Sequence, residues 1–235
     1  MIKNYNKSSI VLASNCREDK SVFRLVKNLT KKKFPNETNL KVALITTARM
    51  GFRDKKRSIL LKNTKKMTEK FEYEKRLGLP LEYIDCSRKK NYEKFEKTIK
   101  ECKIIWIIGG DTLYLLYHLK KSGFINLLKK RIMNDNIIFV GCCAGAIISG
   151  KSIKPVFIDR TRKIKLDKYM QKKTKYYLKN TYKKKFWQKK NNIQCLNLVQ
   201  NLDVVPHCDH RNKKRISTLK KHKMYCLPER KQLII

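Results

Sequence analysis

The chain has 235 residues, of which 41% are hydrophobic, and it carries a formal net charge of +39. That apolar content suffices for a sizeable core and excludes a chain that is disordered throughout. The sequence shows neither a signal-peptide segment at its start nor a run of the about 18 apolar residues that span a membrane. We therefore expect a soluble, cytoplasmic protein that makes no membrane contact.

The basic charge is concentrated in one segment but is not confined to it. Residues 160–190 hold 14 lysines or arginines and one acid, Asp167, and the rest of the chain is also strongly basic. We interpret this as a general bias toward lysine, arising by mutational drift in an AT-rich genome. Residues 160–194 then form a lysine-rich surface insert, because a charge run is usually a solvated face. Aromatic residues among these lysines could stack on single-stranded nucleic acid, which is the less favoured interpretation.

Eight cysteines are scattered along the chain without a C-x-x-C pair, which favours reduced thiols over a disulfide framework. A zinc site can be drawn from Cys195, Cys208 and His210, but its spacing matches no common ligand pattern. We expect no metal and no other cofactor.

Short apolar runs alternate with helical patterns through the first two thirds of the chain. They predict strands over residues 9–13, 40–46, 81–84, 104–108 and 137–140, and helices over residues 20–29, 58–75, 92–102 and 113–119. The run at 104–108 is apolar throughout, which is typical of a strand covered on both faces of a parallel sheet. The alternation predicts a doubly wound α/β domain, in which sites form at the carboxyl ends of the strands.

The last third of the chain is less regular. Residues 155–159 form a candidate short strand that ends in a carboxylate, and the apolar pattern resumes over 196–205. The two runs at 224–228 and 232–235 predict a closing hairpin.

Residues 136–150 carry the clearest chemical pattern. A β-branched run leads into Gly-Cys-Cys-Ala-Gly at 141–145, and an apolar, helix-compatible segment follows. This is the form of a nucleophile elbow, in which a strained strand-to-helix turn holds the nucleophile between small neighbours. The central residue is Cys143, and the positive end of the helix dipole would favour its thiolate. On this pattern alone the alternative stays open that Cys142 and Cys143 are small buried residues in a tight turn.

Two other strand ends carry chemistry of the same kind. Gly109 and Gly110 end the run at 104–108, and bare backbone N–H groups there could stabilise an oxyanion together with the N–H of Ala144. Taken alone, a simple strand-ending turn is the favoured interpretation of the glycine pair. His207 follows Pro206 at another strand end, where it is well placed to act as a general base.

Four segments together resemble the peptidase E family, the α-aspartyl dipeptidases, which are relatives of the cyanophycinases. They are residues 107–116, 140–148, 205–209 and 225–229, and they follow one another in the family's order. The resemblance implies a flavodoxin-like, mostly parallel sheet flanked by helices, related to the class I glutamine amidotransferases. It covers about residues 8–235, so we expect residues 1–235 to form one domain that carries the insert at 160–194.

The resemblance also implies roles for individual residues. Cys143 matches the nucleophile, His207 the base, and Gly110 with Ala144 the oxyanion hole. The triad acid that follows the elbow helix at a strand end best matches Asp159.

Two points of this correspondence remain open. Asp209 is a second candidate for the acid, because a carboxylate lies two residues after the histidine in the related cysteine amidotransferases. Family members favour an N-terminal aspartate, and Arg160, Arg162 and Arg211 are candidate partners for its carboxylate.

The chain departs from the family's pattern in its nucleophile, which is serine in the family and cysteine here. A thiolate beside His207 would be a competent acyl acceptor, so we expect hydrolysis of short peptides with an N-terminal aspartate. The alternatives are an inactive homologue and a cysteine amidase or amidotransferase-like enzyme that releases ammonia. Asp111 stands where asparagine is common in the family. A small peptide is the expected partner, and assembly into a homo-oligomer is left open.

Overall fold

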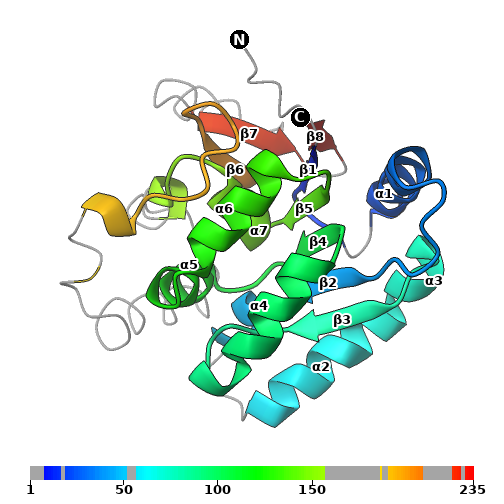
Figure 1. The fold of residues 1–235 in the computed structure, drawn as a ribbon. Helices are drawn as coiled ribbons and strands as arrows, with labels where there is room; N and C mark the ends of the chain where they lie inside the picture. The colour runs from blue at the N-terminus through cyan, green and yellow to red at the C-terminus, as the bar shows by residue number, and fades with distance from the viewer. Residues whose placement is uncertain are drawn as a thin grey trace.

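The computed structural model in Figure 1 describes residues 8–16, 19–51, 57–156, 186, 190–208, 224–228 and 231–235. A six-stranded sheet with the order β3-β2-β4-β5-β1-β8 forms its centre. The strands are β1 (Ser9–Ala13), β2 (Val42–Ile45), β3 (Leu81–Ile84), β4 (Ile104–Ile107), β5 (Ile138–Cys142) and β8 (Gln232–Ile234). All neighbours from β3 to β1 pair in parallel, and only β8 runs antiparallel to its neighbour, β1.

Helices cover both faces of this sheet. One face is covered by α4 (Tyr92–Glu101), α5 (Thr112–Lys121), α6 (Phe124–Asn134) and α7 (Ala144–Ser149), and the other by α1 (Lys20–Lys33), α2 (Arg57–Lys70) and α3 (Tyr73–Leu77). The described residues also include the short 3-10 helices η1 (Thr47–Gly51), η2 (Lys89–Asn91) and η3 (Lys190–Asn192). The predicted doubly wound, flavodoxin-like α/β fold is confirmed.

The continuous apolar runs follow from burial on both faces. In β4, Ile105 and Ile107 belong to the core under α4–α7, whereas Ile104 and Trp106 belong to the core under α1 and α3. Successive side chains of a strand point to opposite faces, so each residue of β4 enters one of the two cores. Burying both faces in this way is what allows a parallel strand to lack polar residues.

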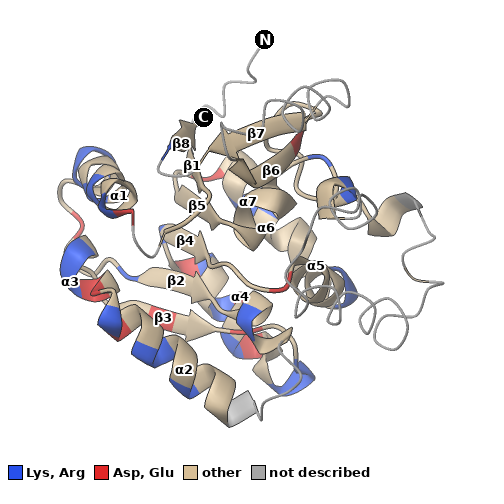
Figure 2. Cartoon of the chain, turned by 180° about the vertical axis from the view of Figure 1, so that it is seen from behind, with Lys and Arg blue, Asp and Glu red and all other residues tan. Residues whose placement is uncertain are grey.

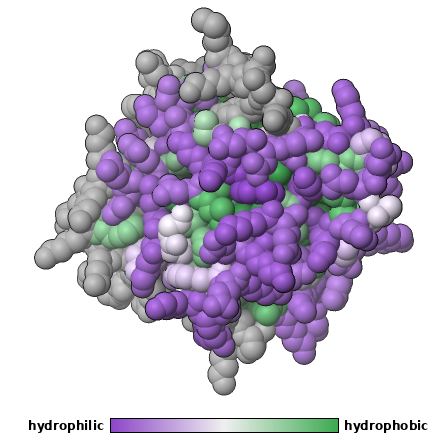
Figure 3. All heavy atoms as spheres, in the orientation of Figure 1, coloured by the Kyte–Doolittle hydropathy of each residue, from purple (hydrophilic) through white to green (hydrophobic). Residues whose placement is uncertain are grey.

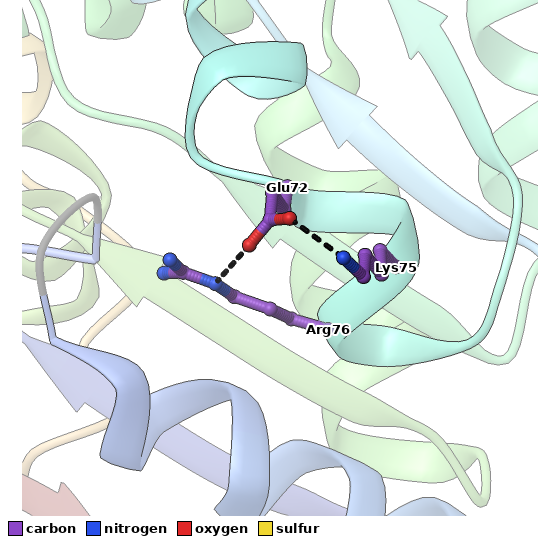
Figure 4. Close-up of polar contacts among 3 residues, drawn as sticks. All are labelled: Glu72, Lys75 and Arg76. Carbon is purple, nitrogen blue, oxygen red and sulfur yellow. Dashed lines mark hydrogen bonds and ion pairs between the residues drawn. The ribbon is translucent and has the colours of Figure 1, made fainter.

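The helix predicted over residues 58–75 is interrupted. Helix α2 ends at Lys70 and α3 begins at Tyr73, with Glu72 between them at a φ of 52°. The break lets Tyr73 enter the core, where its ring centroid lies 4.8 Å from that of Phe23 and 5.6 Å from that of Trp106. Figure 4 shows the Glu72 carboxylate at the turn, bridging Lys75 at 3.0 Å and Arg76 at 3.8 Å.

The predicted closing hairpin is wrong. Strand β7 (Met224–Pro228) pairs in parallel with β6 (Asp203–Cys208) in a separate two-stranded sheet, and β8 joins the main sheet. The open edge of β1 supplies an antiparallel partner for β8, with Leu12 opposite Leu233. Leu233 packs against the main core there, a contact that a hairpin with β7 would not require.

Two further segments differ from their predictions. Residues 154–156 are helical rather than extended, and the Val156 N–H donates to the Ile153 carbonyl oxygen at 3.0 Å. Pro155 suits the first turn of a helix, because N–H groups there have no helical partner. Helix α6 was not predicted, and Gly123, with a φ of 78°, separates it from α5.

Charged residues occupy the outer surfaces of several elements. Figure 2 shows lysine and arginine on α1, α2, α3 and α4, and Figure 3 shows a largely hydrophilic face in which apolar residues are visible only in small areas. No helix in the described ranges combines the length and the apolar content that crossing a bilayer requires. Of the predicted insert at 160–194, the structure describes Phe186 and residues 190–194. They contact α5, where Lys120 Nζ donates to the Asn191 carbonyl oxygen at 2.6 Å.

Candidate active site

Cys143 occupies the predicted strand-to-helix turn. It follows β5, precedes α7 and has the backbone angles φ 51° and ψ −101°. Its N–H donates to the Ala13 carbonyl oxygen at 3.0 Å, and its own carbonyl accepts from the Ile147 N–H at 3.0 Å. The backbone thus changes from strand pairing to helix pairing at a single residue. A non-glycine residue in this conformation is strained, and such strain is concentrated at functional sites.

The glycines around Cys143 allow a close approach of strand and helix. A Cβ atom on Gly141 would lie 2.8 Å from the Gly145 carbonyl oxygen, and one on Gly145 would lie 2.6 Å from that of Ile107. Both distances are shorter than any real Cβ contact. The small residues predicted on each side of the thiol are therefore needed to pack α7 against β4 and β5.

His207 brings its imidazole to the thiol from a different sheet. The sequence predicted it after a strand end, whereas it lies within β6; its Nε2 atom is 3.2 Å from Cys143 Sγ. The side chain of His207 is exposed, whereas the other residues of β6 are buried. This distance allows a proton to pass between sulfur and nitrogen, which is the geometry of a nucleophile and its base.

The loop after β4 forms another wall of the site. A Cβ atom on Gly109 would lie 3.0 Å from Cys143 Cβ and 3.4 Å from its Sγ, so this glycine faces the thiol. Gly110 has a φ of 152°, and a Cβ atom there would lie 2.5 Å from the Ala48 carbonyl. Among the described residues, the N–H groups of Gly110 and Ala144 have no hydrogen-bond acceptor.

Asp111 stands where the resemblance to peptidase E implies asparagine, and it caps a helix and anchors a loop. Its carboxylate accepts the Tyr114 N–H at 3.0 Å and caps α5. Its own N–H donates to the Ala48 carbonyl oxygen at 2.8 Å, which fixes the Gly110 loop against η1. Aspartate and asparagine cap helices about equally well, so this departure leaves the loop intact.

These groups surround a pocket of about 100 Å³ at the carboxyl ends of the strands. Its wall includes Cys143, His207, Gly109, Gly110, Ser14 and Arg49. A larger cavity of about 410 Å³ lies at the opposite ends of the strands, near Lys41, Lys103 and Cys102. We assign the site to the smaller pocket, because it holds the paired thiol and imidazole and lies where sites form in doubly wound sheets.

Two residues at the pocket were not predicted from the sequence. Ser14 follows β1, and Arg49 lies in η1 directly after β2. Both could have been found from their position just beyond the carboxyl end of a parallel strand. The same position pointed to Gly110 and Cys143. The candidate acids Asp159 and Asp209, and the candidate substrate arginines Arg160, Arg162 and Arg211, lie outside the described residues.

The other thiols near the site differ from Cys143 in their surroundings. Cys16 is fully buried, and burial together with a hydrogen bond to Cys142 raises the pKa of its thiol. Cys142 is buried in β5, and its sulfur accepts the Cys16 N–H at 3.0 Å. Cys143 is only partly buried, so of the three it is the one open to a reactant. The described residues include no group of three histidines, cysteines or carboxylates able to hold a metal ion.

Residues 10–227 match the family model described as Peptidase family S51. The chain belongs to peptidase family S51. The matched range includes the elbow, the glycine loop and His207, and it confirms the resemblance to peptidase E drawn from four short segments.

Individual relatives support the same assignment. Two curated proteins named Peptidase E, from Shewanella sp. (strain W3-18-1) and Shewanella putrefaciens (strain CN-32 / ATCC BAA-453), are each 40% identical over 58 residues. This match spans 25% of the chain and only 24% of each curated relative.

Solved structures share the fold of this chain over almost its whole length. A "Putative Peptidase E Protein from Listeria monocytogenes EGD-e" is 20% identical, with a TM-score of 0.59 over 97% of this chain and 94% of that one. A peptidase from an acI-B1 Actinobacterium is 13% identical, with the same TM-score over 97% of this chain and 83% of that one. At these identities the likeness concerns the fold alone.

Proposed function

We propose that the chain is a peptidase that hydrolyses short peptides, with Cys143 as nucleophile and His207 as its base. The observation that carries the proposal is the 3.2 Å separation of Cys143 Sγ and His207 Nε2 at a strained strand-to-helix turn. Membership of peptidase family S51 supports the reaction class. Cysteine in place of the family's serine keeps the nucleophilic chemistry, because a thiolate is an effective acyl acceptor.

The proposed reaction has two half-reactions. The Cys143 proton passes to His207 Nε2 while sulfur attacks the scissile carbonyl carbon, and the N–H groups of Gly110 and Ala144 stabilise the resulting oxyanion. The His207 imidazolium then protonates the leaving amine, and the C–N bond breaks to leave a thioester on Cys143. His207 next takes a proton from water, whose oxygen attacks the thioester, and the thiol and a carboxylic acid are released.

We further propose that the substrate begins with aspartate. A pocket of about 100 Å³ accommodates a small side chain, and Arg49 in its wall supplies a basic residue among those described. Arg160 and Arg211 remain proposed contacts for the substrate carboxylate. Asp159 remains the first candidate for the acid that orients His207, and Asp209 the second.

The test is hydrolysis of an aspartyl dipeptide and of the matching asparaginyl dipeptide by the wild-type protein, Cys143→Ala, Cys143→Ser and Cys226→Ala. We expect the wild type and Cys226→Ala to release the second amino acid, and Cys143→Ala to be inactive. Iodoacetamide should inhibit the wild type but not any residual activity of Cys143→Ser. Equal rates for the wild type and Cys143→Ala would refute the role of the thiol.

The same assay separates the alternatives. Ammonia released from the asparaginyl peptide without peptide cleavage would indicate an amidase. Absence of hydrolysis in a wild-type protein whose Cys143 reacts rapidly with iodoacetamide would indicate a different substrate. Absence of both hydrolysis and a rapid reaction of Cys143 with iodoacetamide would indicate an inactive homologue.

A further inference from the structure

Strand β6 contains an irregularity at the residue that carries the imidazole. Val205 pairs with Cys226 and Cys208 pairs with Pro228, so Pro206 and His207 together stand opposite Leu227 alone. Two residues against one is a β-bulge, a feature that turns a side chain away from the regular alternation of a strand. His207 has a φ of 58° within this bulge, and its side chain is exposed and directed to Cys143.

The bulge is bound by a side chain from the main sheet. Ser14 directly follows β1, and the residue is 1% exposed. Its Oγ accepts the His207 N–H at 2.9 Å and donates to the Leu227 carbonyl oxygen at 2.7 Å. One hydroxyl therefore holds both strands of the β6–β7 sheet at the position where their register shifts.

We infer that Ser14 is a positioning residue that fixes the β6 bulge and thereby aims His207 at Cys143. The inference rests on the proposed function of the Cys143 and His207 pair. Ser14 also lies in the wall of the pocket, but both hydrogen bonds of its hydroxyl go to backbone groups. It acts on the reaction through His207, and it does not act as nucleophile or base.

The physical reason is that the conformation of the bulge depends on side-chain hydrogen bonds. The Cys208 thiol donates to the Val205 carbonyl oxygen at 3.2 Å within β6, and the Ser14 hydroxyl links the bulge to β7 and to the end of β1. A left-handed backbone angle is uncommon for a residue with a side chain and has to be held by its surroundings. Without the Ser14 hydroxyl, the His207 N–H loses this acceptor and the buried Leu227 carbonyl loses this donor. The β6–β7 pair would then relax to a more regular register, and the imidazole would move away from the sulfur.

The experiment compares Ser14→Ala with Ser8→Ala as a matched control. Ser8 immediately precedes β1, so it lies at the other end of the same strand, and its Oγ donates to the Asp135 carbonyl oxygen at 2.6 Å. Both changes remove a hydroxyl bound to backbone, but only one of them touches the bulge. The readouts are the rate of Cys143 alkylation by iodoacetamide as a function of pH, and kcat and KM for an aspartyl dipeptide.

We expect Ser14→Ala to lower the alkylation rate at neutral pH and kcat by about tenfold or more, within the about 10²–10⁴-fold effect of a general base. The KM of Ser14→Ala should change little. Ser8→Ala should keep the wild-type alkylation rate, kcat and KM. In a His207→Ala background, Ser14→Ala should have no further effect on the alkylation rate. Equal rates for Ser14→Ala and Ser8→Ala would overturn the inference. It would also be overturned if Ser14→Ala slowed alkylation as much in the His207→Ala background as in the wild type.

The same variants distinguish a failure of the proposed function from a failure of the Ser14 inference. If His207→Ala alone leaves the alkylation rate and kcat unchanged, the nucleophile and base pair is wrong, whatever Ser14 does. If Ser14→Ala does not fold, Ser14→Thr and Ser14→Val form a second pair of nearly equal shape that differs in the hydroxyl. The inference is supported if Ser14→Thr keeps the wild-type alkylation rate and kcat while Ser14→Val loses them. It is overturned if Ser14→Thr does not keep them.

Discussion

His207 Nε2 lies 3.2 Å from Cys143 Sγ, although 64 positions separate the two residues in the chain. Cys143 ends a strand of the main sheet, and His207 belongs to the two-stranded β6–β7 sheet. Their distance is therefore set by how one sheet is attached to the other. Within the described residues, Ser14 supplies side-chain hydrogen bonds to both β6 and β7 at this junction.

The first prediction concerns which cysteine reacts. Cys143 is partly exposed beside His207, whereas Cys16 is fully buried with the pKa of its thiol raised by burial. Because the thiolate is the reactive form, we expect iodoacetamide to label Cys143 first and Cys16 last. Replacement His207→Ala should slow labelling of Cys143, and mass spectrometry of each cysteine-containing peptide gives the rates.

Cys226 is the internal control for this labelling, because it is also partly exposed. Its rate should be unaffected by His207→Ala. If Cys143 is labelled no faster than Cys226 in the wild-type protein, the special reactivity of the elbow thiol is disproved.

Much of the site was predictable because its signals are local. The turn at Cys143 needs small neighbours on both sides, and the Gly110 loop and the Pro206–His207 segment each follow an apolar run. Parallel strands place their carboxyl ends at one edge of the sheet, so the signals at Gly110 and Cys143 converge without knowledge of the strand order. The approach of His207 does not follow from this rule, because it belongs to the separate β6–β7 sheet. The fold class follows from the same alternation of strands and helices.

The features that were missed depend on contacts between distant segments. The helix break at Glu72 is explained by the packing of Tyr73 against Phe23 and Trp106, which no spacing within α2 or α3 reveals. Likewise, the choice of β8 for the edge of β1 depends on pairing across most of the chain. The role of Ser14 requires both the bulge in β6 and the position of β7.

The second prediction concerns Gly110. Its φ of 152° is unfavourable for any residue with a side chain, and a Cβ atom would overlap the Ala48 carbonyl at 2.5 Å. Gly123 has a φ of 78° but nothing within 4 Å of an added Cβ. Gly123→Ala should therefore cost about 1–2 kcal/mol of the free energy of unfolding, from the backbone angle alone. Gly110→Ala should cost more, because the backbone overlap adds to that penalty.

Urea unfolding of both variants measures the difference. Gly110→Ala should also reduce peptide hydrolysis, since moving the loop displaces an N–H group proposed to hold the oxyanion. Similar stability losses in the two variants would show that η1 moves aside to accept the side chain.

The third prediction concerns the turn at Glu72. Its left-handed backbone favours glycine, and its exposed carboxylate forms ion pairs with the exposed Lys75 and the half-buried Arg76 (Figure 4). Both replacements remove the same ion pairs, so the backbone should decide the difference between them. We expect Glu72→Gly to melt about 2–4 °C above Glu72→Ala, the shift that 1 kcal/mol gives in a chain of this size. Circular dichroism measures both midpoints, and a higher midpoint for Glu72→Ala would show that the turn is not strained.

The last prediction concerns alkaline pH. Burial raises the pKa of the Cys102 thiol from its ordinary value of 9.0 to about 11. Below pH 9 the thiol is protonated in the folded and the unfolded chain alike, so its contribution to stability is fully present. Between pH 9 and about 11 the unfolded chain releases this proton while the folded chain retains it, which favours unfolding. The free energy of unfolding should therefore fall as pH rises through this window.

Other groups titrate in the same range, so the informative quantity is the difference between variants. In urea unfolding, Cys102→Ala should lower stability at neutral pH, because a buried side chain is truncated, but should lose less stability than the wild type above pH 9. Cys226→Ala, which removes a partly exposed thiol, is the control for the loss of a cysteine. A Cys102→Ala protein with the same pH dependence as the wild type would mean that the folded chain ionises this thiol as readily as the unfolded one. The cavity beside Cys102 at the amino ends of the strands would then have to admit enough water to solvate the thiolate.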